Sequence, residues 1–212
     1  MASQIKFIFF DMGKVLLNFD HQRLVDQTAK LSGSTAKDIE AILFQPPHDL
    51  ENRFERGELN SIEFHQSFCE QSNCQVDHNE LMLAIADIFW LNTPIVHVVA
   101  QLRSINFPMA VLSNTCSAHW EFAIKHFAVL RLFQQRVLSY EEQSMKPDAK
   151  IYESAIGMAN QLVSCGPDEI FFTDDREENV QAARAAGMQA EIYDSPAKLV
   201  SQLKAGGIQL PG

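Results

Sequence analysis

Residues 5–13 read Ile-Lys-Phe-Ile-Phe-Phe-Asp-Met-Gly, an apolar run that ends in a carboxylate and a glycine. The run over 5–10 is short and rich in aromatic and β-branched residues, which is typical of a buried strand. A carboxylate directly after such a strand lies at the carboxyl end of a sheet, where open α/β folds bind their ligands. Gly13 allows the backbone to turn sharply and to approach a ligand closely. Asp11 is therefore a candidate functional residue, although an aspartate there can also be a simple turn former.

Four more apolar runs have the length of strands, and amphipathic stretches separate them. This alternation of strands and helices predicts an α/β fold with a parallel sheet and right-handed crossovers. The further strands are expected at 108–112, 136–140, 169–173 and 188–193, and the helices at 95–104, 117–127, 148–161, 177–186 and 196–204.

The stretch from 17 to 92 has a different character, because no convincing strand pattern occurs in it. Capping pairs open two of its helices, and a third stretch has apolar residues along one helical face. These helices are expected at 36–44 (after Thr35 with Asp38), 61–72 (after Asn60 with Glu63) and 78–90. An all-helical insertion is therefore predicted just after the first strand.

Composition narrows the classes of partner. The formal net charge is −10, which argues against broad binding to nucleic acid or to an anionic membrane, because both require a basic face. No stretch approaches the roughly 20 apolar residues of a membrane span. The N-terminus lacks a signal-peptide pattern, and none of the four cysteines forms a C-x-x-C pair. A cytoplasmic protein with free thiols is expected.

Three more polar segments follow later strands, and parallel strands bring all of them to the edge of the sheet where Asp11 lies. Carboxylates gathered there repel one another unless a cation joins them. Oxygen ligands point to a hard ion, and Mg²⁺ is the usual ion beside phosphate. The segments are Ser113-Asn114-Thr115, Lys146-Pro147, and Asp174-Asp175 with Asn179.

In order and approximate spacing, these four segments resemble the motifs of the haloacid-dehalogenase-like hydrolase superfamily, and the match spans nearly the whole chain. The resemblance implies a Rossmann-like core with a five-stranded parallel sheet in the order 3-2-1-4-5. It also implies that the insertion is a small helical cap domain. The core would comprise residues 1–16 and 93–212, and the cap residues 17–92.

The same resemblance implies a Mg²⁺-dependent phosphatase that acts on a small phosphorylated metabolite. Asp11 would be the nucleophile that forms an aspartyl-phosphate. Lys146 would stabilise the transition state and hold phosphate. The other implied roles are metal binding by Asp11, the Gly13 carbonyl, Asp175 and Asp174, phosphate binding by the Ser113 hydroxyl and the Asn114 backbone N–H, and support from Asn179.

One position departs from the family pattern. Most phosphatases of the family carry a second aspartate two positions after the nucleophile, where it acts as general acid and base, and here that position is Gly13. A branch that includes sugar-phosphate phosphatases, such as a bacterial α-D-glucose-1-phosphate phosphatase, also has Asp-x-Gly-x-Val, and this chain is most similar to that branch. His21 is the nearby histidine that could replace the missing acid.

Other functions are compatible with parts of the pattern. A 2-haloacid dehalogenase also lacks the second aspartate, but it does not need paired acids such as Asp174-Asp175. A binding or regulatory protein on a weakened phosphatase scaffold would explain Gly13. A response-regulator-like receiver fits the long insertion poorly. A monomer and a homodimer are equally compatible with the sequence.

Overall fold

A five-stranded parallel sheet forms the centre of the protein. The computed structural model describes residues 3–211. The strands are β1 (Phe7–Phe10), β4 (Met109–Ser113), β5 (Gln135–Leu138), β6 (Ile170–Asp174) and β7 (Gln189–Ile192). They lie in the order β5-β4-β1-β6-β7, with every neighbouring pair parallel. In sequence order this is 3-2-1-4-5, so the predicted fold class is confirmed.

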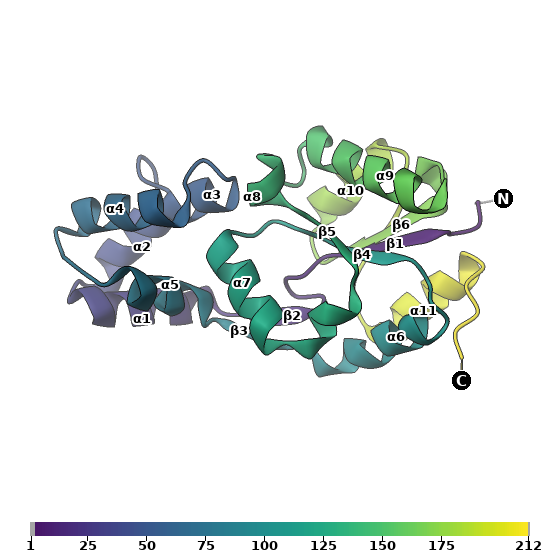
Figure 1. Ribbon diagram of the computed structural model, residues 1–212, viewed down its shortest axis with the longest axis horizontal. Coiled ribbons are helices and arrows are strands. Elements are labelled where there is room, and N and C mark those ends of the chain that lie inside the picture. The colour runs from purple at the N-terminus through teal and green to yellow at the C-terminus, as the bar shows by residue number, and fades with distance from the viewer. Residues whose placement is uncertain (1–2, 212) are drawn as a thin grey trace.

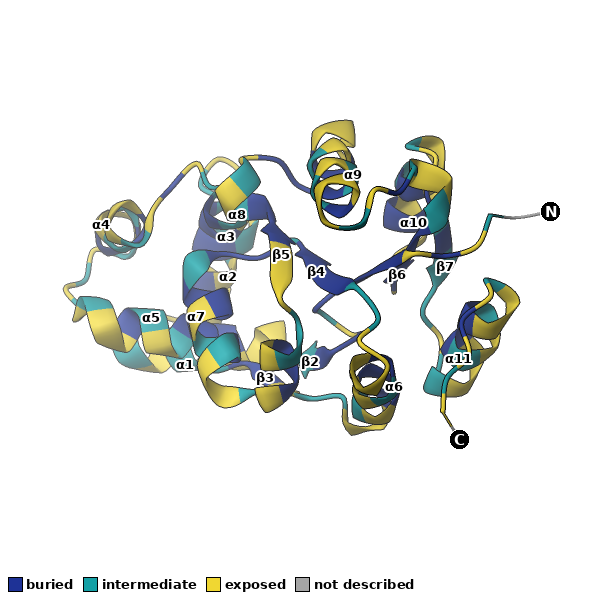
Figure 2. Ribbon diagram, turned by 45° about the vertical axis from the view of Figure 1, so that its right-hand side comes forward, coloured by how far each residue is buried: buried dark blue, intermediate teal, exposed yellow. Residues whose placement is uncertain are grey.

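Helices cover both faces of the sheet (Figure 1). On one face lie α9 (Ala149–Val163) and α10 (Glu177–Ala185), and on the other lie α6 (Thr93–Ser104) and α11 (Pro196–Ala205). Along β1, Phe7 and Phe9 pack into the core beneath α9 and α10, whereas the intervening residues pack toward α6 and α11. Because both faces are covered, β1 is apolar throughout and reads as a continuous run rather than an alternation. In Figure 2, strands β4 and β6 are buried and the outer sides of the helices are exposed, whereas the edge strand β5 begins with exposed residues.

The remaining elements of this part are short. After β4 come α7 (Ser117–His126) and a 3₁₀ helix at Ala128–Leu132, and a second 3₁₀ helix at Pro167–Glu169 precedes β6. The strand expected at 136–140 ends at Leu138, and Ser139–Glu142 form the one-turn helix α8. None of the described helices combines the length and apolar character needed to cross a bilayer.

Five helices fill most of the chain between β1 and α6, and they lie together beside the sheet (Figure 1). They are α1 (His21–Ser32), α2 (Ala36–Phe44), α3 (Leu50–Glu55), α4 (Ser61–Ser72) and α5 (His78–Ala86). The predicted bounds of α2 and α4 are confirmed, and the Asn60–Glu63 capping box is present. Helices α1 and α3 are not predicted from the sequence, and α5 ends at Ala86, four residues before the predicted end at residue 90.

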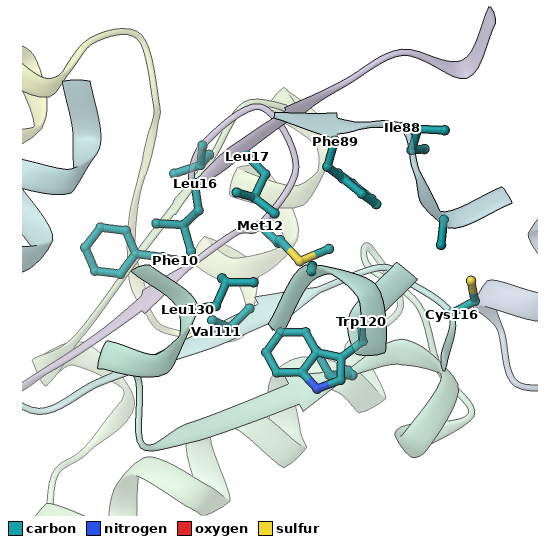
Figure 3. Close-up of a cluster of buried hydrophobic side chains, with 14 of the residues drawn as sticks. Phe10, Met12, Leu16, Leu17, Ile88, Phe89, Val111, Cys116, Trp120 and Leu130 are labelled. Atoms are coloured by element: carbon teal, nitrogen blue, oxygen red, sulfur yellow. The ribbon is translucent and has the colours of Figure 1, made fainter. Parts of the chain in front are cut away.

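The expectation that the insertion contains no strand was wrong. Strands β2 (Leu17–Phe19) and β3 (Phe89–Leu91) pair antiparallel, with Leu17 opposite Leu91 and Phe19 opposite Phe89. Each strand has three residues, too few for a period of two to be distinguished from a helical face. Figure 3 shows side chains of this two-stranded ribbon, Leu17 and Phe89, in one apolar cluster with Phe10 and Met12. The ribbon therefore packs on the end of β1, next to Asp11.

Candidate active site

The polar segments predicted to converge do lie at one edge of the sheet. Asp11 follows β1, Asn114 follows β4, Asp174 ends β6, and Lys146 lies between α8 and α9. A cavity of about 240 Å³ opens at this edge. Its lining comes partly from the sheet side (Asp11, Met12, Gly13, Asn114, Thr115, His119, Met145, Lys146, Asp175, Arg176 and Asn179) and partly from the insertion and its ribbon (Phe19, His21, Asn52, Glu55, Ile88 and Phe89).

Lys146 holds the acidic groups together. Its Nζ donates to Asp11 Oδ1 at 2.7 Å, to Asp174 Oδ2 at 2.6 Å and to the Leu112 carbonyl at 3.0 Å. Lys146 is 4% exposed and Asp11 7% exposed, so these are buried charge-assisted hydrogen bonds. All three donor positions of the ammonium are occupied, which fixes the direction of the lysine.

Electrostatics in the site favour an additional positive charge. Burial raises the pKa of Asp11 to about 7, with Lys146 opposing the rise and Asp174 adding to it. Burial lowers the pKa of Lys146, but Asp11 and Asp174 raise it more, so the net shift is upward. Burial and Asp174 also raise the pKa of Asp175. One lysine does not balance three carboxylates, and a divalent cation would lower the pKa values of Asp11 and Asp175 again.

The paired acids occupy different environments. Asp174 is fully buried, and its carboxylate accepts from Asn179 Nδ2 at 3.0 Å on each oxygen and from the Arg176 backbone N–H at 2.9 Å. Asp175 is exposed and lines the cavity. Asp174 therefore anchors Lys146 and Asn179, while Asp175 presents a free carboxylate.

An oxygen-ligand ion fits this arrangement. Carboxylate oxygens of Asp11, Asp174 and Asp175 lie within 4.8 Å of one another. Asp11 Oδ1 is bonded to Lys146, whereas no donor in the described part of the chain bonds to Oδ2. The carboxylates of Asp11 and Asp175 both line the cavity. Mg²⁺ beside phosphate is usually bound by only one or two protein carboxylates, so this pair suits it.

Asn114 has a role that the sequence did not reveal. Its side chain accepts from the Lys146 backbone N–H and donates to the Lys146 carbonyl, both at 2.8 Å. Ser113, for which a phosphate contact was expected, is 1% exposed, donates its hydroxyl to the Asn114 carbonyl at 3.2 Å and lies outside the cavity lining. Thr115 lines the cavity in its place.

Gly13 faces an aromatic ring rather than open space. A Cβ atom at this position would lie 2.9 Å from Phe19 Cε1, closer than side-chain carbons approach one another, and 3.9 Å from Asp11 Oδ2. Phe19 belongs to β2 and lines the cavity, and Lys14 Nζ lies 4.4 Å from its ring centre. The Phe19 ring of the ribbon therefore fills the space beside residue 13. Most phosphatases of the family that the sequence resembles have a second aspartate at this position.

The insertion contributes two titratable groups to the cavity. Glu55, the last residue of α3, is half-buried, and burial raises its pKa to about 7 against the opposing charges of Lys146 and Arg176. His21, the first residue of α1, lies between the rings of Phe19 and Phe44, and burial lowers its pKa. The sequence favours a solvated, salt-bridged turn around Gly57 for Glu55 and its neighbouring arginines over a contact with substrate, but the structure places Glu55 at the end of α3 and in the cavity lining.

A second polar cluster adjoins the cavity through His119, which is part of its lining. Ligand atoms of Glu51, Cys116 and His119 lie within 4.8 Å of one another, and all three residues are buried. Glu51 Oε1 is 3.5 Å from His119 Nε2, and neither atom has a hydrogen-bond partner in the described structure. Burial raises the pKa of Glu51 and lowers that of His119 to about 4, so burial favours the neutral form of both groups. No histidine pattern marks this cluster in the sequence, because its members come from α3 and α7, which are more than 60 residues apart along the chain.

Solved structures share this fold. BT-2542, a HAD family enzyme from Bacteroides thetaiotaomicron whose structure is a complex with magnesium and inorganic phosphate, is 26% identical, with a TM-score of 0.77 over 90% of this chain and 95% of that one. A predicted HAD-like family hydrolase from Porphyromonas gingivalis is 19% identical, with a TM-score of 0.79 over 98% and 100% of the two chains. L-2-haloacid dehalogenase from Xanthobacter autotrophicus is 15% identical, with a TM-score of 0.61 over 97% and 84%.

The likeness to the Porphyromonas and Xanthobacter proteins establishes the fold alone. A search of curated proteins gives no match. The family model of the haloacid dehalogenase-like hydrolases, in contrast, matches residues 5–187, which include all four polar segments at the edge of the sheet. This chain therefore belongs to the haloacid dehalogenase-like hydrolase family.

Proposed function

We propose that the protein is a Mg²⁺-dependent phosphatase that hydrolyses a small phosphorylated metabolite through an aspartyl-phosphate. The observation that carries the proposal is the meeting of Asp11 and Asp175 within 4.8 Å of each other, beside a lysine that is already bonded to Asp11. A free pair of carboxylates at this place suits phosphate chemistry, in which a cation must offset the charge of the substrate. The magnesium and phosphate complex of BT-2542 supports the same assignment.

Asp11 is suited to attack phosphorus. Lys146 fixes the carboxylate through Oδ1 and leaves Oδ2 free toward the cavity. Held in this way, the nucleophile is positioned before substrate arrives, which removes part of the entropic cost of the reaction. Lys146 also supplies positive charge where negative charge develops on the phosphoryl oxygens.

The remaining residues position these groups. Asp175, Asp11, the Gly13 carbonyl and, directly or through water, Asp174 would hold Mg²⁺, which when bound neutralises phosphate and orients it. Asn179 and Lys146 restrain Asp174. We assign phosphate contacts to the Asn114 backbone N–H and to the Ser113 hydroxyl, which would have to rotate away from its present acceptor.

The helical insertion, residues 17–92, is proposed to act as a cap over the core formed by 1–16 and 93–212. Phe19, Asn52, Glu55 and Phe89 bring it to the cavity, so it would exclude water during transfer. The volume of about 240 Å³ suits a small metabolite rather than a macromolecule. Gly13 further favours a good leaving group, such as the anomeric oxygen of a sugar phosphate like glucose 1-phosphate.

A phosphate-release screen tests the proposal. Sugar phosphates, nucleotides and phospho-acids are incubated with the protein, with Mg²⁺ and with a chelator, and Asp11→Asn serves as the inactive control. Mg²⁺-dependent release is expected. Chloride release from 2-chloropropionate without added metal, together with no phosphate release, would identify a dehalogenase, the activity of the Xanthobacter structural relative. Binding of phosphate esters without turnover would identify a regulatory protein.

A further inference from the structure

We propose that Glu55, which α3 brings to the cavity opposite the sheet edge, is the general acid and base of the phosphatase reaction; this inference rests on the proposed function. A proton is needed because expulsion of an alkoxide from phosphorus is slow unless the leaving oxygen is protonated. Residue 13 cannot supply it, because glycine has no side chain and the Phe19 ring occupies the adjoining space. The proton donor must therefore come from another wall of the cavity.

Glu55 is the carboxylic acid best placed for this task among the residues that line the cavity. The other two lining carboxylates, Asp11 and Asp175, are assigned to the nucleophile and the metal. His119 turns its Nε2 to Glu51 at 3.5 Å, away from open space. His21 is held between two aromatic rings, and burial and Lys14 lower its pKa, which disfavours the imidazolium form that a general acid requires.

Contacts with the core hold the Glu55 backbone in place. Ser139 Oγ, at the start of α8, donates to the Glu55 carbonyl at 2.6 Å. Two residues later, Gly57 has a φ of 73° and packs so closely on the Tyr140 backbone that a Cβ atom would collide with the carbonyl oxygen. The segment is therefore docked on α8, and in this arrangement Glu55 lines the cavity.

The surroundings keep Glu55 ready to exchange a proton near neutral pH. Burial raises its pKa to about 7, while Lys146 and Arg176, on the facing wall, act to lower it. An acid with a pKa near the working pH is the most effective proton carrier. Other charged groups lie on its own helix and on the helices packed against it. Four of them have partners: Glu51 is buried beside His119, Arg53 pairs with Glu58, Glu141 pairs with Arg136, and Glu142 accepts from Ser154. The remaining groups are the exposed Lys37, Asp38, Glu40, Glu63 and Glu70 and the half-buried His65.

The proton balance closes over both steps. In the first, Asp11 Oδ2 attacks phosphorus, the bond from phosphorus to the leaving oxygen breaks, and the Glu55 carboxyl gives its proton to that oxygen. The products are an alcohol, an aspartyl-phosphate and the Glu55 carboxylate. In the second step, Glu55 removes a proton from water as the water oxygen attacks phosphorus. The bond from phosphorus to Asp11 then breaks, which releases inorganic phosphate and restores both side chains.

The test compares two leaving groups in Glu55→Gln, Glu55→Asp and Glu58→Gln. Glu58 is the matched control, because it lies in the same segment but is exposed and paired with Arg53 and Arg56. Nitrophenolate leaves without protonation, whereas the alkoxide of glycerol phosphate requires it. Stopped-flow release of nitrophenolate and steady-state release of phosphate are measured from pH 5 to 9 with saturating Mg²⁺.

With glycerol phosphate, Glu55→Gln is expected to lower kcat on the order of 10²- to 10⁴-fold. With p-nitrophenyl phosphate, the same variant should release its first equivalent of nitrophenolate at nearly the wild-type rate and then slow, because the second step has lost its base. The ionisation near pH 7 should disappear from the glycerol phosphate profile, Glu55→Asp should restore part of the rate, and Glu58→Gln should match the wild type.

Equal loss of the first step with both substrates, or an unchanged kcat with glycerol phosphate, would overturn the assignment of Glu55 and leave the proposed function intact. Absence of Mg²⁺-dependent phosphate release by the wild-type protein on any substrate would instead overturn the proposed function, and the role of Glu55 with it.

Discussion

Asn114 and Lys146 exchange two hydrogen bonds of 2.8 Å, although 31 residues separate them in the chain. The amide side chain of Asn114 acts as a backbone partner for Lys146, so it fixes the loop from which the lysine reaches Asp11. The residue after β4 and the loop between α8 and α9 are thus joined before any ligand binds.

Replacing Asn114 with Ala should therefore lower kcat by about 10- to 100-fold, the usual effect of removing an outer hydrogen bond from a catalytic group. The loss arises because the Lys146 loop is no longer held. Asn160→Ala is the control, because Asn160 also donates its amide to a backbone carbonyl, that of Cys165, but lies on α9 outside the cavity lining. The phosphatase rates of Asn114→Ala and Asn160→Ala are compared, and equal rates would show that Asn114 does not position Lys146.

Asp11→Asn should abolish turnover rather than weaken binding. The amide is nearly the same size as the carboxyl group but is a very poor nucleophile, so a loss on the order of 10⁴-fold or more is expected. Phosphate release under saturating substrate measures it, and retention of folding is checked by circular dichroism. Substantial residual activity in a protein free of deamidation would show that another residue attacks phosphorus.

The two acids of the Asp174-Asp175 pair should respond differently to the same change. Asp175→Asn should raise the Mg²⁺ concentration for half-maximal activity by roughly 10-fold or more with little effect on folding, because Asp175 is exposed. Asp174→Asn should destabilise the fold by about 3 kcal/mol or more, because it removes a buried partner of Lys146.

Activity as a function of Mg²⁺ concentration and urea unfolding separate the two effects. If Asp174→Asn unfolds at the wild-type urea concentration while Asp175→Asn unfolds earlier, the environments assigned to these carboxylates would be reversed.

Glu51→Gln should stabilise the protein at pH 8 by about 1 kcal/mol or more, because each unit by which the folded pKa exceeds the unfolded pKa corresponds to about 1.4 kcal/mol. Burial raises the pKa of Glu51 in the folded state, so the folded protein keeps a proton that the unfolded chain loses. Stability contributed by this group is therefore full at acid pH and falls as pH rises past the unfolded pKa of about 4.3.

Glutamine does not titrate, so the gain should shrink to near zero at pH 4.5. Urea unfolding of Glu51→Gln at both pH values checks this, with the exposed Glu153→Gln on α9 as control. Destabilisation of Glu51→Gln at pH 8 would mean that the carboxylate is ionised and satisfied by a partner.

The parallel sheet was predictable because local patterns agree with the fold, whereas its strand order was implied only by the family resemblance. Phe7–Phe10 are buried on both faces and leave a continuous apolar run, and parallel strands must place Asp11 and Asp174 at the same edge. Lys146 was recognisable only through its spacing from the other motifs. Its hydrogen bonds to Asp11 and Asp174 form because the fold brings these three residues to the same edge of the sheet.

The helices and strands that the sequence did not predict depend on contacts between distant parts of the chain. Phe89–Leu91 continue the apolar pattern of α5, and only pairing with Leu17–Phe19 makes them a strand. Helix α3 has six residues, too short for a periodic signal, yet it carries both Glu51 and Glu55. The cluster that contains Glu51 and the position of Glu55 in the cavity lining therefore could not be predicted from the spacing of residues in the sequence.

The β2–β3 ribbon has a mechanical consequence. The chain enters and leaves the group of five helices through two strands that are bonded to each other, with Phe19 beside Phe89. Paired strands cannot slide past one another without breaking their ladder, so the two connections move as one strap. Any displacement of the helices must then be a bend or twist about this strap, and because Phe19 belongs to it, such a bend also moves the ring that covers Gly13.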